Sequence, residues 1–212
     1  MATGLNVTGD AIVSGNLRLG GTLSPPIDKA NILALARAQS FPIPLTDFRV
    51  WDAMQTPLPG TPATDDLGLV GGTFGTATPT LRTQDLKTAG ASSNRARVLV
   101  QLPWEYVAGQ SISLRFKSGM ITTVADTTAT LDVEVYKLQG DPDDAIGSDL
   151  VSTAATTINS LVFADIDFAL NASALSPGDI LDVRITTTVT DAASGTAVIA
   201  GISSARLLAD VR

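Results

Sequence analysis

The sequence predicts an all-β protein, and three observations support this fold class. Apolar and polar residues alternate strictly over residues 111–116, 131–136 and 181–186, which places one face of each strand in a core and the other in solvent. Turn sequences rich in Gly, Pro and Asp separate these runs, as at residues 140–144 and 176–179. The runs are also rich in Val, Ile and Thr, which suit a pleated, half-buried surface.

These runs predict a C-terminal antiparallel β-sandwich over residues 96–212. About eight strands in a segment of this length favour a jelly-roll-like body. The further strands are expected over residues 97–102, 119–124, 161–170, 196–202 and 205–211.

A six-residue repeat opens the chain and reads NVTGDA, IVSGNL and RLGGTL from Asn6 to Leu23. Hexapeptide periods are typical of β-helical stacks, in which Gly and Asp or Asn form the turns. Three repeats cannot bury a core alone, so we expect residues 1–27 to form a short β-prism from three chains. A pair of ordinary hairpins is the alternative. The side chains expected at the trimer interface are Val7, Val13, Leu17 and Leu19.

Residues 28–95 are expected to hold one short helix and an extended arm rich in Pro and Gly. The helix is predicted over residues 28–38, with Asp28 as its N-cap. A long irregular segment with apolar anchors is unusual inside a compact domain. Such a segment either lies across a neighbouring subunit or packs as a loop-rich subdomain on its own chain. The expected anchors are Phe48, Trp51 and Met54.

The composition argues against catalysis and against cofactor chemistry. The 212 residues include no His and no Cys. Their absence removes the commonest general base, the Ser-His and Cys-His nucleophile pairs, and thiolate zinc sites. We therefore expect a protein that is not an enzyme, with no catalytic residue, no cofactor and no metal site.

Charge and hydropathy indicate the kind of partner. A net charge of −7 disfavours binding to nucleic acid, because its phosphates bind best to a basic protein surface. Only 17% of residues are charged and the mean hydropathy is +0.25, as expected when apolar surface is buried between subunits. No run of about 18 apolar residues occurs, so no membrane partner is expected. The first residues lack the pattern of a signal peptide, which favours synthesis and folding in the cytoplasm.

Two groups of carboxylates were candidates for chemistry. Asp141, Asp143 and Asp144 gather on one turn, but their spacing is not that of a calcium loop, so a solvated turn is favoured. Asp165 and Asp167 flank Ile166 and should share one face of a strand. A soluble sheet face is favoured there over the paired carboxylates of a glycosidase.

Aromatic residues are few, at 5% of the chain. Trp51, Trp104 and Tyr106 are the candidates for a platform on which a sugar could stack. With so few aromatics, buried anchors are favoured over that platform.

Four stretches carry a family resemblance: GLNVTGDAIVSGNLRLGGTL, FPIPLTDFRVWDAMQTPLPGTPATDDLGLVGGTFGT, LPWEYVAGQSISLRF and LSPGDILDVRITTTV. Together they resemble the trimeric capsid decoration, or cement, proteins of tailed bacteriophages. The resemblance implies a homotrimer that binds the major capsid protein on the virion surface and is made in the host bacterial cytoplasm.

Two rival functions stay open beside that resemblance. A head-fibre or tail-fibre module that recognises a host surface glycan shares the repeat, and it predicts exposed aromatic residues near Trp104. A carbohydrate-active enzyme would instead use Asp165 and Asp167.

Overall fold

The computed structural model describes residues 37–73, 75, 77–141 and 143–211. The six-residue repeat and most of the predicted helix fall outside the described residues. The same holds for the four expected interface residues Val7, Val13, Leu17 and Leu19.

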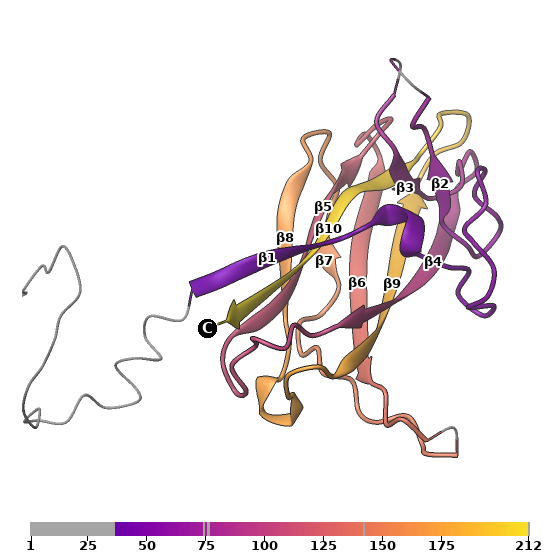
Figure 1. Cartoon of the computed structure of the whole chain (residues 1–212). Helices are drawn as coiled ribbons and strands as arrows, with labels where there is room; N and C mark the ends of the chain where they lie inside the picture. The colour runs from indigo at the N-terminus through magenta and orange to yellow at the C-terminus, as the bar shows by residue number, and fades with distance from the viewer. Residues whose placement is uncertain (1–36, 74, 76, 142, 212) are drawn as a thin grey trace, which may run out of the picture. The chain divides into compact units, whose positions relative to one another are not determined.

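The described residues form two antiparallel sheets that pack as a β-sandwich, which confirms the all-β fold class (Figure 1). The six-stranded sheet has the order β2-β3-β10-β5-β8, with β1 also paired to β10, and the four-stranded sheet has the order β4-β9-β6-β7. No helix of the described part is long and apolar enough to span a membrane. The strands are β1 (Arg37–Ile43), β2 (Gly68–Val70), β3 (Thr80–Arg82), β4 (Gly90–Gln101), β5 (Ile112–Met120), β6 (Thr127–Lys137), β7 (Thr156–Thr157), β8 (Ala164–Ala169), β9 (Ile180–Asp191) and β10 (Ala200–Val211), with 3-10 helices η1 (Leu45–Asp47) and η2 (Ala172–Ala174).

Strand β10 is the centre of the six-stranded sheet. On one side it pairs with β5 over most of its length. On its other side it pairs first with β3, at Gly201 and Ile202, and then with β1, from Ala205 to Val211. Two strands from the first half of the chain therefore share one edge of the last strand (Figure 1).

Period-two alternation explains the core. In β6 and β9, alternate side chains such as Val133, Val135 and Val183 are buried between the sheets, while their neighbours face outward. From the other sheet, Phe116 and Phe168 meet edge to face with ring centroids 6.1 Å apart. Sandwiches are stable when each sheet hides its apolar face against the other in this way.

Two of the predicted boundaries need correction. Arg37 and Ala38 begin strand β1 and so do not end a helix, because their backbone pairs with the end of β10. The sandwich also does not begin at residue 96, since β1, β2, β3 and the first half of β4 precede that position. Within the described residues, the segment predicted as an arm packs into the sandwich of its own chain. This agrees with the alternative expectation, a loop-rich subdomain packed on its own chain.

The strand predictions inside the body are largely confirmed. The alternating runs at 111–116, 131–136 and 181–186 lie almost wholly in β5, β6 and β9. The separate strand expected at 119–124 is wrong, because β5 continues to Met120 and the chain then turns. The runs at 196–202 and 205–211 contribute to a single strand whose register shifts between Ile202 and Ser204.

Candidate functional site

Residues 49 and 65–67 pair with the β4 edge of the four-stranded sheet. Arg49 exchanges backbone hydrogen bonds with Arg97 of β4, at 2.8 and 3.1 Å, which fixes this segment along the edge of the sheet. The ring of Trp51 then lies over two guanidinium groups, 5.7 Å from that of Arg95 and 5.5 Å from that of Arg184. Arginine prefers such contacts with an aromatic face.

Asp182 lies on β9, between β4 and β6 in the four-stranded sheet, and its side chain is fully buried. One carboxylate oxygen accepts a hydrogen bond of 2.6 Å from Nε of Arg97. The other accepts from Nε and Nη2 of Arg184, at 3.0 and 2.9 Å. The Arg184 guanidinium also lies 4.6 Å from the ring centroid of Tyr136. Burial, together with the nearby Glu134 carboxylate, raises the pKa of Tyr136.

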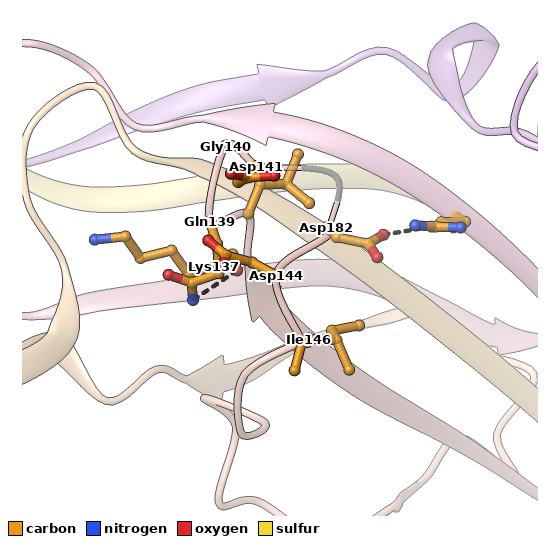
Figure 2. Close-up of a pocket in the computed structure, with 10 residues that line it drawn as sticks. Lys137, Gln139, Gly140, Asp141, Asp144, Ile146 and Asp182 are labelled. Carbon is orange, nitrogen blue, oxygen red and sulfur yellow. Dashed lines mark hydrogen bonds and ion pairs between the residues drawn. The ribbon is translucent and has the colours of Figure 1, made fainter.

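A hollow of about 420 Å³ lies beside this buried carboxylate and is walled by the loop that follows β6. Figure 2 shows Asp141, Asp144 and Ile146 on the loop, with Asp182 on the strand beside them and its carboxylate directed to an arginine. The residues that line the hollow are Arg97, Lys137, Leu138, Gln139, Gly140, Asp141, Asp144, Ala145, Ile146 and Asp182. Charged, amide and apolar groups therefore meet in one open depression.

Trp104 lies at the same end of the sandwich, where β4 and β6 finish and β9 begins; we call this the Trp104 end. Its side chain is 73% exposed. A Cβ atom at Gly178 would come within 2.6 Å of the indole, so the ring rests against a glycine that has no side chain. Gly178 also has a φ of +80°, a conformation that favours glycine. The sequence Ser176-Pro177-Gly178-Asp179 therefore supports the indole as well as turning the chain.

Hydrogen bonds connect the turn at residues 176–179, which contacts Trp104, to the residues that line the hollow. Asp179 accepts from Nζ of Lys137 at 2.8 Å, and its backbone oxygen accepts from the N–H of Leu102 at 2.8 Å. The N–H of Leu138 bonds to the backbone oxygen of Ile180 at 3.0 Å. Several large apolar side chains of β4, β9 and the loop after β6 are exposed, namely Leu99, Leu138, Ile146 and Ile180.

The three expected arm anchors differ in their burial within this chain. Phe48 is 1% exposed and belongs to the core of the sandwich. Trp51 is half-buried over Arg95 and Arg184, and Met54 is half-buried in the turn that follows. Trp51 and Trp104, both candidates for the sugar-stacking platform, therefore contact different residues: Trp51 lies over two arginines and Trp104 lies against Gly178.

The expectation of buried aromatic anchors is correct for Tyr106 and wrong for Trp104. Tyr106 is 3% exposed and donates its hydroxyl hydrogen bond to the backbone oxygen of Gln110 at 2.9 Å. Burial raises the pKa of its hydroxyl. Trp104 is two residues away along the chain, where the chain turns between β4 and β5, and its ring lies in solvent.

Asp165 and Asp167 share the outer face of β8, as expected from their spacing. Arg115 of β5 binds Asp167 through two hydrogen bonds, at 2.6 and 2.7 Å, and approaches Asp165 at 3.8 Å. The bond from Arg115 holds the pKa of Asp167 below its ordinary value. A glycosidase acid needs a raised pKa, so this arrangement favours the soluble-face interpretation.

The carboxylates at 141–144 form a turn that closes on itself. The N–H of Asp143 donates to the side chain of Asp141, and the N–H of Asp144 donates to its backbone oxygen, both at 3.1 Å. All three aspartates are exposed. Among the described residues, no group of three acidic side chains is placed to hold a metal ion.

No protein-family model matches the sequence, and no curated protein is detectably similar to it. Solved structures with similar folds include a family 30 carbohydrate-binding module, at 13% identity and a TM-score of 0.36. That match covers 81% of this chain and 99% of the module. The carbohydrate-binding module TmCBM27, described with specific mannan recognition, matches at 14% identity and a TM-score of 0.35, over 69% of this chain and 81% of the module.

The Endo-D glycoside hydrolase domain of Streptococcus pneumoniae R6 matches at 13% identity and a TM-score of 0.35, over 62% of this chain. This chain spans only 18% of that domain. The assignment as a β-sandwich rests on the strand pairing described above. Similarity at this level indicates nothing about what this chain binds.

Proposed function

We propose that this chain is a glycan-recognition module, and that it binds sugar at the Trp104 end. The observation that supports this most directly is the 73% exposure of Trp104, whose ring lies against Gly178. The flat apolar face of an indole can pack against the C–H groups of a pyranose ring, and its N–H can donate to a hydroxyl. Single exposed apolar residues are common, but this one lies at the same end of the sandwich as a hollow with several polar groups.

The hollow supplies what a sugar also requires. Each hydroxyl donates and accepts hydrogen bonds, and the side chains of Gln139, Asp141 and Asp144 offer both kinds of group. Ligand sites usually combine apolar walls with a few polar groups of this sort, and Leu138 and Ile146 supply apolar wall. In a virion, such a module would be part of a head fibre or tail fibre that recognises the host surface.

Replacing Trp104 with alanine tests the proposal, using a glycan array followed by calorimetry on the glycans bound. We expect Trp104→Ala to weaken binding by about tenfold or more, as for an aromatic residue central to an interface. The control is Val162→Ala, because Val162 is 76% exposed at the opposite end of the sandwich. If parent and Trp104→Ala bind with equal affinity, the indole has no part in recognition.

A second candidate is a homotrimeric cement protein bound to the major capsid protein on the virion surface. We infer that the sandwich is a jelly roll, because sheets ordered β3-β10-β5-β8 and β4-β9-β6-β7 are connected as two Greek keys. Supporting this candidate are the low charged fraction of 17% and the exposure of the neighbouring Leu161 and Val162.

Light scattering should give about three times 21.8 kDa for a trimer, and co-sedimentation with capsids then separates cement from fibre. A monomer at micromolar concentration would exclude the trimer. Neither candidate function needs a catalytic residue, a cofactor or a metal.

A further inference from the structure

The charges around the hollow at the Trp104 end are not balanced, and this restricts the chemistry of a ligand. Both cations that line the hollow are already engaged. Nε of Arg97 bonds to the buried Asp182 at 2.6 Å, and Nζ of Lys137 bonds to Asp179 at 2.8 Å and to the backbone oxygen of Ala174 at 3.4 Å.

The two exposed carboxylates of the hollow have no cationic partner. In the part of the chain that the structure describes, neither Asp141 nor Asp144 takes part in an ion pair. Among the described residues, the side chain of Asp141 accepts a hydrogen bond from the N–H of Asp143, and that bond leaves its charge in place. Figure 2 shows both carboxylates on the loop that walls the hollow. Among the side chains that line the hollow, Arg97 and Lys137 are positive and Asp141, Asp144 and Asp182 are negative, so the excess charge that a ligand meets there is negative.

The apolar side chains define the rest of the ligand. Leu138 and Ile146 line the hollow and are 38% and 52% exposed, so they can contact carbon atoms of a ligand. A hexose ring has C–H groups on its faces and hydroxyls around its rim, which matches apolar walls with carboxylate acceptors. A sialic or uronic acid would bring its own carboxylate toward Asp141 and Asp144 in a protein of net charge −7.

We propose that the hollow selects neutral hexose oligosaccharides and rejects glycans that carry carboxylates. This inference rests on the proposed glycan recognition, and it assigns the selection to Asp141 and Asp144. Each carboxylate accepts hydrogen bonds from sugar hydroxyls and repels an anionic sugar.

The test uses the full chain and two panels of probes. The neutral panel contains hexasaccharides of glucose, mannose and galactose. The acidic panel contains oligogalacturonate and oligosialic acid. We expect the parent to bind at least one neutral probe about tenfold or more tightly than any acidic probe.

The decisive variant is the double substitution Asp141→Lys with Asp144→Lys, which reverses the charge at the hollow. We expect it to lose affinity for the neutral probe and to gain affinity for acidic probes, with a gain that falls as salt is added. The matched control is Asp52→Lys with Asp65→Lys. It changes the net charge equally at two exposed positions outside the hollow and should leave the preference unchanged.

The possible outcomes separate the two proposals. If the parent prefers acidic probes, or if the control shifts the preference as much as the charge reversal does, the selection by Asp141 and Asp144 is wrong while glycan recognition stands. If the parent binds neither panel and Trp104→Ala changes nothing, the proposed function itself fails. A neutral preference that reverses only in the decisive variant supports both.

Discussion

Replacing Asp182 with alanine is expected to lower the free energy of unfolding by about 3 kcal/mol. Its buried carboxylate is shared by Arg97 and Arg184, so the substitution leaves two partly buried cations without their common partner. For a domain of this size, the loss corresponds to a fall in melting temperature of about 6–12 °C. Urea denaturation followed by tryptophan fluorescence measures it, because Trp51 lies over Arg184.

Two further variants are controls for this measurement of stability. Asp182→Asn keeps an acceptor of nearly the same shape and should lose less stability. Asp165→Ala removes an exposed carboxylate that is 3.8 Å from Arg115, and should change stability little. Equal unfolding midpoints for Asp182→Ala and the parent would mean that the buried cluster contributes nothing to the fold.

Asn94→Asp is expected to destabilise the protein by about 3 kcal/mol at neutral pH. Asn94 is fully buried, and its amide group donates to the backbone oxygens of Ala63, Thr64 and Asp66, at 2.8, 3.4 and 3.2 Å. A carboxylate there would donate to none of them and would place negative charge against three carbonyl oxygens. At acid pH the carboxyl is protonated and can donate one hydrogen bond, so the loss should become smaller.

Limited proteolysis of residues 59–66 measures the local effect, since Asn94 ties this loop to β4. Loosening it should also affect Trp51, whose N–H donates to the side chain of Asp66 at 3.2 Å. The matched control is Asn171→Asp. The side-chain oxygen of Asn171 accepts from the N–H and hydroxyl of Ser173, and a carboxylate keeps that role. Equal cleavage rates in the two variants would contradict the proposed role of Asn94.

Sequence reasoning recovered the parts of the fold that local pattern controls. The alternation in β6 and β9 predicted both the strands and their buried faces. It could not find the pairing of β1 with β10, because Arg37 and Val211 are brought together only by the assembled sheet. The same limit explains the error in the domain boundary, since an edge strand containing Pro42 has little alternation of its own.

The candidate site shows the same limit more sharply. The sequence brought Trp104 to attention, but its burial was misjudged because the supporting glycine, Gly178, is far away along the chain. Asp182 and Arg184 were visible only as the polar half of an alternating run. Nothing local indicated that a buried carboxylate there would join two arginines. The hollow depends on a loop, a strand and a turn, so only their spatial arrangement identifies it.

The central place of β10 has a consequence for how the protein acquires its structure during synthesis. Strands β1 and β3 leave the ribosome early, yet their hydrogen-bonding partner is residues 200–211. Until that segment is made, these strands have no native partner on that edge, and contacts of such long sequence separation form slowly. Unpaired strand edges attract other chains. The nascent protein should therefore depend on chaperones or low local concentration, and its yield should fall steeply when β10 is weakened.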